Sequence, residues 1–117
     1  MDYVDGYVLA VPQDKREDYR KLAELGARVF RDHGALQVVE CWGEDVPEGK
    51  LTSFPMAVKL EPGEVVVFAW VRWPDKATRD AGMKAAFEDP RMHAYGTTMP
   101  FDGKRMIFGG FDVLVEG

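Results

Sequence analysis

Polar residues that could act together occur on three stretches that otherwise read as apolar strands. They are Asp5 and Tyr7, Glu40 and Trp42, and Trp70 and Arg72. A carboxylate held among aromatic side chains is desolvated, which raises its pKa and suits it to act as a general acid or base. Alternatively, Asp5, Glu40 and Arg72 pair with backbone groups or with one another, because buried charges need partners. These six residues are our first ligand-binding candidates, provided that their strand faces meet at one cavity.

A second polar group lies near the C-terminal end of the chain. Its members are Asp89, Arg91, His93, Asp102, Lys104 and Arg105. Arg91 or Arg105 could clamp a ligand carboxylate with two hydrogen bonds, and His93 could carry a proton. The sequence favours the structural alternative, in which the two aspartates pair with the arginines and hold the loops. Arg91, His93 and Arg105 are nevertheless kept as ligand-binding candidates.

Metal and thiol chemistry are disfavoured by the residue inventory. His33 and His93 are the only histidines, they have no ligand spacing, and Cys41 has no second cysteine to pair with. We expect no metal site and no cofactor. His33 is expected to end a helix and to interact with its dipole, and Cys41 to be a small buried residue of a strand.

Composition bounds the class of protein. The 117 residues are expected to form one domain, 1–117, and 15 Lys and Arg against 20 Asp and Glu give a formal charge of −5 that disfavours nucleic acid as a partner. No run approaches the ~20 apolar residues of a membrane span. The start, MDYVDG, has acids where a signal peptide has basic residues, so we expect a cytoplasmic protein without a membrane partner.

The first half of the chain predicts a strand, a helix and a strand. Tyr3 to Val11 alternates between an aromatic side with a carboxylate, expected to face a cavity or a partner, and a small side expected to pack on helices. That small side consists of Val4, Gly6, Val8 and Ala10. A helix is predicted from Asp14, as the start of a relative of the capping box, to His33, with Gly34 as its C-terminal glycine. The second predicted strand is Ala35 to Gly43.

The connection Glu44 to Pro62 lacks sustained periodicity, although Ser53 could cap one or two helical turns. Such a long connection is typical of a lid or an interface arm. The next stretch, Glu64 to Pro74, is apolar on both faces of an extended strand, with Val65, Val67, Ala69, Val71 and Trp73 on one and Val66, Phe68, Trp70 and Arg72 on the other. We therefore expect both faces of this strand to be covered by other parts of the structure.

The last part of the chain predicts a helix from an Asp75 cap to about Glu88, a further short turn of helix at Arg91 to Tyr95, and a loop over Gly96 to Pro100. Asp102-Gly103 indicates a tight turn before a final strand, Met106 to Val115. Gly109-Gly110 within that strand indicates a bulge or a close backbone approach.

This order of elements predicts an α+β fold, the ferredoxin-like βαββαβ arrangement, with a four-stranded antiparallel sheet and both helices on one face. The other face would then lack cover. Leaving three or four large side chains exposed forgoes about 1.5 to 3 kcal/mol each, whereas a whole domain is stable by only about 5 to 15 kcal/mol. We therefore expect a homodimer whose two sheets pack face to face and form a dimeric α/β barrel.

Several runs also carry a resemblance that covers nearly the whole chain. They are DYVDGYVLAVP, HGALQVVECWGEDVPEG, TSFPMAVK, EVVVFAWVRWPDKATRD, EDPRM and MPFDGKRMIFGGF. Together they resemble the DUF1428 family of small bacterial proteins. The resemblance implies a dimeric α/β-barrel fold and no chemistry, because the family is defined by an unknown function. The wider class of such barrels includes cofactor-free monooxygenases and small-molecule-binding proteins, which is analogy at the level of the fold.

Three functions remain open from the sequence. The first is a homodimer that binds a small-molecule ligand in a pocket beside the sheet, under the Glu44 to Pro62 connection. The second is a cofactor-free enzyme of monooxygenase or isomerase type, with Glu40, Asp5 or His93 as its base. The third is an interaction module that acts only through its dimer surface. No phosphate-binding loop or ligand-spaced histidine set favours an enzyme over a binding protein.

Overall fold

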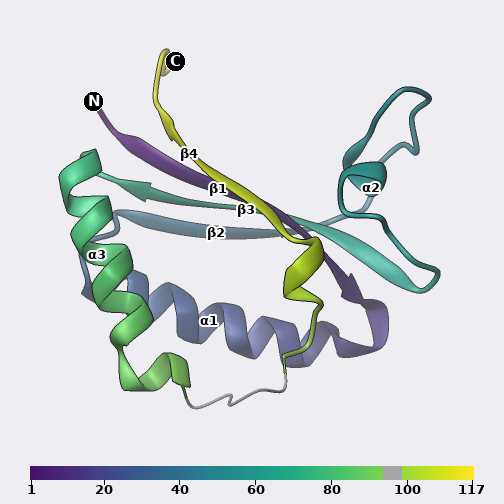
Figure 1. Cartoon of the computed structure of the whole chain (residues 1–117), viewed down its shortest axis with the longest axis horizontal. Coiled ribbons are helices and arrows are strands. Elements are labelled where there is room, and N and C mark those ends of the chain that lie inside the picture. Colours follow the sequence, from purple (N-terminus) through teal and green to yellow (C-terminus); the bar gives the residue numbers. More distant parts are fainter. Residues whose placement is uncertain (94–98) are drawn as a thin grey trace.

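The structure, a computed structural model, describes residues 1–93 and 99–117. Its strands and α-helices are β1 (Tyr3–Pro12), α1 (Arg16–Asp32), β2 (Gln37–Trp42), α2 (Phe54–Ala57), β3 (Glu64–Trp73), α3 (Lys76–Glu88) and β4 (Ile107–Asp112). The strands form one antiparallel sheet in the order β2-β3-β1-β4. The long helices α1 and α3 lie on one side of it (Figure 1). The predicted ferredoxin-like α+β fold is confirmed.

Most predicted helix ends are confirmed, and one is wrong. Asp75 caps α3 by accepting a hydrogen bond from the Thr78 amide, and Ser53 caps α2. Gly34 follows α1 with a φ of 111°, a conformation that favours glycine. Asp14 does not cap α1, because residues 13–15 first form a 3₁₀ turn that moves the start of the α-helix to Arg16.

The last strand is shorter than predicted and has no bulge, since Gly109 and Gly110 face Gly6 and Asp5 in unbroken register. The alternative, a close approach, is confirmed, because a Cβ on Gly110 would meet the Tyr3 hydroxyl and lie 2.8 Å from Arg79 Nη2.

Two further connections are helical. Gly103–Arg105 forms a 3₁₀ helix capped by Asp102, where we expected only a tight turn. Pro90–His93 is also a 3₁₀ helix, which agrees with the short turn of helix predicted from Arg91 but begins one residue earlier. Tyr95 and most of the predicted loop Gly96 to Pro100 lie outside the described residues.

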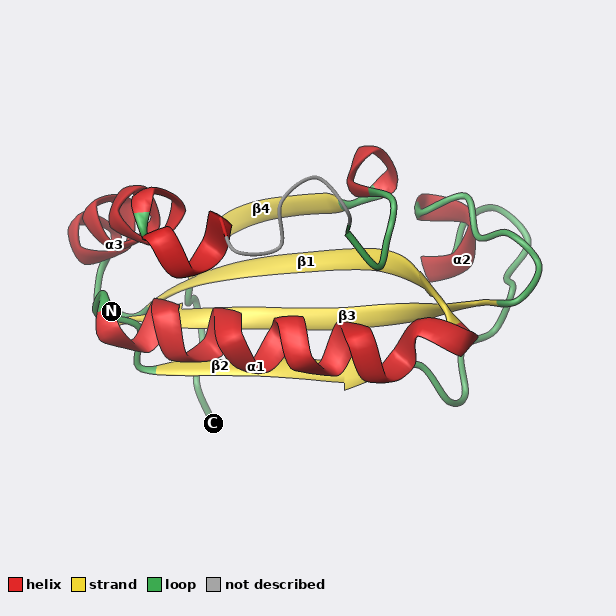
Figure 2. Ribbon diagram, turned by 90° about the horizontal axis from the view of Figure 1, so that it is seen from below, coloured by secondary structure: helices red, strands yellow, loops and turns green. Residues whose placement is uncertain are grey.

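The face of the sheet that packs on the helices carries the large side chains of β1. The register of β1 and β3 sets Tyr3, Asp5, Tyr7, Leu9 and Val11 against Trp73, Val71, Ala69, Val67 and Val65. Leu9, Val11 and Val67 pack around Tyr19 of α1, which runs along the sheet (Figure 2). We call this the helix face. The prediction that the small side of β1 packs on helices is wrong, because bulky side chains are needed to fill the layer between sheet and helices.

Among the described residues, the opposite face is covered at one end only. There Val58 packs on Val8, Ala10 and Val66, and α2 lies on the side of the sheet away from α1 (Figure 1). The rest we call the open face. It consists of Val4, Gly6, Gln37, Val39, Cys41, Phe68, Trp70, Arg72, Ile107, Gly109 and Phe111. Cys41 is thus partly exposed on this face rather than buried in a core as expected.

In the part of the chain that the structure describes, no helix combines the length and apolarity needed to cross a bilayer.

Candidate functional site

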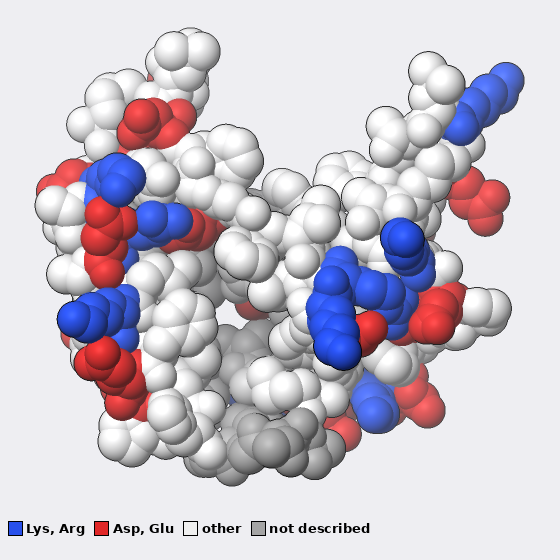
Figure 3. All heavy atoms as spheres, viewed as in Figure 1, with Lys and Arg blue, Asp and Glu red and all other residues white. Residues whose placement is uncertain are grey.

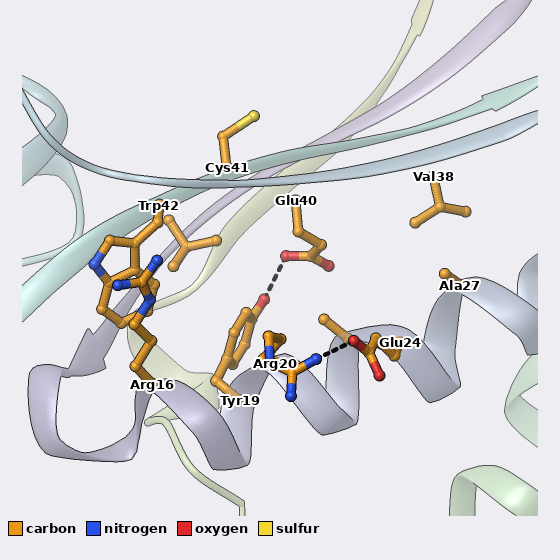
Figure 4. A pocket seen from close by; sticks show the side chains of 11 residues that line it. Arg16, Tyr19, Arg20, Glu24, Ala27, Val38, Glu40, Cys41 and Trp42 are labelled. Atoms are coloured by element: carbon orange, nitrogen blue, oxygen red, sulfur yellow. Dashed lines mark hydrogen bonds and ion pairs between the residues drawn. The ribbon is translucent and has the colours of Figure 1, made fainter.

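A carboxylate held by two tyrosines lies on the helix face. Glu40 Oε2 accepts a hydrogen bond of 2.5 Å from the Tyr7 hydroxyl, and Glu40 Oε1 accepts one of 2.6 Å from the Tyr19 hydroxyl. The three side chains come from β2, β1 and α1. Figure 4 shows Glu40 and Tyr19 pointing toward each other across the space between strand and helix. Each carboxylate oxygen therefore has a donor on a different element.

Burial sets the charge behaviour of this group. Burial raises the pKa of Glu40 above its usual value, and the hydrogen bonds from Tyr19 and Tyr7 offset only part of that rise. Burial, and then the neighbouring Glu40 charge, hold the pKa of each tyrosine far above its ordinary value of 10.0. The tyrosines therefore stay protonated hydrogen-bond donors at neutral pH, and Glu40 is the member that can exchange a proton.

Glu40 forms part of the wall of a pocket between α1 and β2, with a volume of about 340 Å³. The other lining residues are Arg16, Tyr19, Arg20, Ala23, Glu24, Ala27, Val38, Cys41, Trp42 and Val67. The Cys41 side chain points away from the pocket, whereas Val38, Glu40 and Trp42 point toward α1 (Figure 4). The volume is at the lower end of the roughly 300 to 1,000 Å³ of ligand pockets.

Two arginines of α1 line this pocket, with different partners. The Arg16 guanidinium lies 5.3 Å from the centre of the Trp42 ring. Arg20 donates 2.9 Å to Glu17 and also pairs with Glu24, an interaction drawn in Figure 4. The predicted candidates Glu40 and Trp42 thus share a pocket, and Tyr7 reaches it through its hydrogen bond to Glu40.

Asp5 shares the helix face with Glu40 but has its own partners. Its side chain is buried and accepts hydrogen bonds from Trp73 Nε1 at 3.0 Å and from Arg79 Nη2 at 2.8 Å. The same guanidinium lies 5.1 Å from the centre of the Tyr3 ring. Asp5 is therefore paired, but with side chains of β3 and α3 rather than with backbone groups, Glu40 or Arg72 as in the alternative that we considered from the sequence. The pair with Arg79 ties α3 to β1.

The prediction that Trp70 and Arg72 share a cavity with Glu40 is wrong. Both lie on the open face, opposite Gly6 and Val4, because alternate residues of β3 point to opposite sides of the sheet. Trp70 Nε1 donates 3.3 Å to Gln37, and Arg72 pairs with Asp2 and Glu116.

The C-terminal candidates do not form one cluster either. Arg91 pairs with Asp89 and Asp32, both at 2.8 Å, and Asp89 also contacts His33 Nε2 at 2.9 Å. His93 Nε2 lies 2.8 Å from the Phe87 carbonyl oxygen. The favoured structural pairing of Arg91 with Asp89 is confirmed, and His33 occupies the C-cap of α1 as predicted.

Arg105 forms the second, separate cluster. It binds both Glu64 carboxylate oxygens at 2.7 Å and Asp102 at 3.1 Å. The pairing of Arg105 with Asp102 is the predicted one, and the hydrogen bond from Arg105 lowers the pKa of Glu64. In Figure 3, basic and acidic side chains lie side by side over α3 and near the segment that leads into β4.

Within the described ranges, 1–93 and 99–117, no group of three His, Cys, Asp or Glu side chains is placed to hold a metal ion.

Sequence reasoning missed three residues of these sites. Tyr19 was not named as a candidate, although a buried tyrosine hydroxyl usually needs a polar partner. Arg79 interrupts the apolar stripe of α3, a signal that points to a buried carboxylate such as Asp5. For Arg16 the sequence offered no signal, because its position over Trp42 depends on how α1 crosses β2.

Known proteins match the chain over its whole length. The uncharacterized protein YbaA of Escherichia coli K12 is 53% identical over 116 residues, 99% of both chains, and its Shigella flexneri counterpart matches equally well.

Two solved structures share the fold. A dimeric ferredoxin-like protein from an uncultured marine organism has a TM-score of 0.62 at 12% identity, with both chains fully covered. Rv0793 from Mycobacterium tuberculosis has a TM-score of 0.55 at 15% identity, over 99% of this chain and 98% of that one. Residues 2–103 match the family described as "Protein of unknown function (DUF1428)", so the chain belongs to the DUF1428 family.

Proposed function

We propose that this protein is a homodimer that binds a small molecule in the pocket between α1 and β2, with Glu40 as its polar anchor. The observation that carries the proposal is the Glu40 carboxylate, which lies partly buried in the pocket wall and is fixed by Tyr7 and Tyr19. Taking a charge even partly out of water costs free energy, so an apolar residue would be less costly at this position. A binding role accounts for a carboxylate here.

The pocket has the composition of a ligand site. Four small or branched apolar residues line it, namely Ala23, Ala27, Val38 and Val67. Ligand pockets are commonly apolar with a few fixed polar groups that set orientation. The place expected from the sequence differs, because the 44–62 connection packs Val58 onto the other face of the sheet.

The open face supports the homodimer. Phe68 lies 5.9 Å from Phe54 and 5.8 Å from Trp70 between ring centres, and Phe111 is 62% exposed on the same face. Large contiguous apolar patches are rare on monomers and mark interaction sites. The occupant we propose is the same face of a second copy, because a related fold is described as a dimeric ferredoxin-like protein.

A second candidate is a cofactor-free enzyme in which Glu40 is the base. The raised pKa of Glu40 and the two fixed tyrosine donors favour it. Asp5 is committed to Arg79 and His93 contacts a backbone carbonyl, so Glu40 is the better base of the three. A ligand that is converted by the wild type, and is bound without conversion by Glu40→Gln, distinguishes this candidate from a binding protein.

A thermal-shift screen with small aromatic, quinone and acyl compounds tests ligand binding. Ala27→Phe places a ring in the pocket, and Ala81→Phe makes the same change on the exposed surface of α3. We expect compounds that raise the melting temperature of wild type and Ala81→Phe but not of Ala27→Phe. Equal shifts in all three proteins, or no shift in any, would contradict ligand binding in this pocket. The remaining hypothesis would then be an interaction module that acts only through its dimer surface.

Light scattering tests the homodimer. We expect twice the 13.2 kDa chain mass at micromolar concentration. Phe68→Glu puts a charge on the open face and should give monomers, whereas Phe87→Glu, on an exposed site of α3, should leave the dimer intact. A wild-type monomer would sink the proposal of a homodimer without affecting the pocket.

A further inference from the structure

Arg16 and Arg20 both line the pocket, but only one has acidic partners. Arg20 is held by Glu17 and Glu24. Arg16 forms no ion pair among the residues that the structure describes, and it lies over the Trp42 ring. At the Trp42 end, the pocket therefore has a cation, Arg16, that makes no ion pair with any residue that the structure describes.

The position of Arg16 leaves its hydrogen-bond donors available. The side chain is exposed, its guanidinium lies over the Trp42 ring, and it makes no side-chain hydrogen bond within the described residues. Its N–H groups form a planar fork that matches the two oxygens of a carboxylate.

At the other polar end of the pocket, Glu40 favours a ligand group that donates a hydrogen bond over a ligand anion. Both Glu40 oxygens already accept a hydrogen bond from a tyrosine, and each oxygen retains a lone pair for a further donor. A second anion near Glu40 would be repelled in this desolvated place. A ligand hydroxyl could donate to Glu40.

From these two ends, and resting on the proposed function, we propose that the ligand is a hydroxylated aromatic carboxylic acid. Its carboxylate binds Arg16, its ring lies along Trp42 and the apolar wall, and its hydroxyl donates to Glu40. The pocket volume of about 340 Å³ suits a molecule of one or two rings.

Isothermal titration with three probes of one shape tests the ligand class. 4-Hydroxybenzoate carries both polar groups, 4-hydroxybenzyl alcohol lacks the anion, and benzoate lacks the hydroxyl. We expect 4-hydroxybenzoate to bind about tenfold more tightly than either, since each of the other probes lacks one hydrogen bond to a charged side chain.

Variants assign each end. Arg16→Gln should weaken 4-hydroxybenzoate about tenfold and leave 4-hydroxybenzyl alcohol unchanged. Arg28→Gln, an exposed change on α1 outside the pocket lining, should change neither affinity. Circular dichroism of each variant checks that the fold is intact.

Equal binding of acid and alcohol, or equal losses in Arg16→Gln and Arg28→Gln, would overturn the ligand class while a pocket still binds a small molecule. Absence of saturable binding by all three probes also overturns it. The proposed function itself stands or falls on the Ala27→Phe comparison in the compound screen, so the two failures are distinguishable.

Discussion

The two faces of the sheet bury different chemistry. On the helix face, Asp5 is buried and Glu40 is partly buried, and each carboxylate has donors from neighbouring elements. On the open face, Phe68 and Phe111 are substantially exposed, and the charged Arg72 pairs with Asp2 and Glu116. In the described residues no buried side-chain nitrogen or oxygen lacks a hydrogen-bond partner. We infer that the helix face contains the core of the subunit and its polar site. We infer that the open face is the surface through which two subunits associate.

The largest difference between the faces is expected at the two tryptophans of β3. Trp73 is fully buried, packs edge-on against Phe30 with ring centres 6.3 Å apart, and donates to Asp5. Trp73→Ala should lower the free energy of unfolding by about 3 to 5 kcal/mol, because it leaves a cavity and removes a donor from a buried carboxylate. Urea denaturation measures this loss.

Trp70→Ala is the matched control three residues away. In a background made monomeric by Phe68→Glu, Trp70→Ala should lower the free energy of unfolding by less than about 1.5 kcal/mol, because Trp70 is only partly buried on the open face. Similar losses at Trp73 and Trp70 in that background would mean that the two faces contribute equally to the fold.

The next largest change in the free energy of unfolding is expected for a glycine of α3. A Cβ on Gly82 of α3 would clash with the Trp73 ring and lie 2.5 Å from the His33 carbonyl oxygen. Gly82→Ala should therefore cost about 2 to 3 kcal/mol, because backbone and a fully buried ring must move. A melting temperature equal to that of the wild type would show that α3 can shift away from the sheet.

Gly26→Ala in α1 is the control for helix propensity. There the nearest atom outside the helix backbone is a Phe30 ring carbon at 4.0 Å, so the added methyl group has room. The free energy of unfolding should rise by about 0.5 to 1 kcal/mol, since alanine loses less conformational freedom in a helix than glycine.

These pairs also show what the sequence could predict. Alternation assigned residues of Glu64 to Pro74 to two faces, and the structure agrees with that division. Alternation alone does not say which face the helices cover, so the small side of β1 was assigned to them wrongly. Trp70 and Arg72 were grouped with Glu40 for the same reason. Such choices depend on how the whole layer of side chains fills, which a single strand does not reveal.

The candidate site was predictable in part. Glu40 and Tyr7 were identified because a carboxylate and a phenol are unusual on apolar strands. Tyr19 was missed because a tyrosine at helical spacing fits an apolar stripe. Its hydrogen bond to Glu40 joins α1 to β2 through two residues that lie 21 positions apart in the chain. Local patterns carry no information on that contact.

A third prediction concerns the tyrosine donors. Tyr19→Phe removes the hydroxyl that donates to Glu40 at 2.6 Å. The free energy of unfolding should fall by about 1.5 kcal/mol at pH 7, because the partly buried Glu40 carboxylate loses a charge-assisted hydrogen bond. Tyr3→Phe is the control, since the Tyr3 hydroxyl makes no hydrogen bond within the described ranges. Equal effects at both tyrosines would indicate that water replaces the lost donor.

The smallest effect is a difference in pH dependence between two glutamates of the sheet. The pKa of Glu40 is raised by burial, so its ionised form costs stability at pH values above its folded-state pKa. That cost is relieved as the pH falls toward the ordinary value of 4.5. Relative to Glu40→Gln, the wild type should therefore become more stable as the pH is lowered from neutrality toward 4.5.

Glu64 should give the opposite sign, because the hydrogen bond from Arg105 lowers its pKa. Its contribution is complete above the ordinary value of 4.5 and is lost as the pH falls below it through the folded-state pKa. Relative to Glu64→Gln, the wild type should lose stability on acidification below 4.5. Urea denaturation of the three proteins across this range measures both slopes, and the groups they share cancel in each difference. Slopes of the same sign would mean that Glu40 is solvated in the folded protein, and the charge that distinguishes the helix face would then not be a buried one.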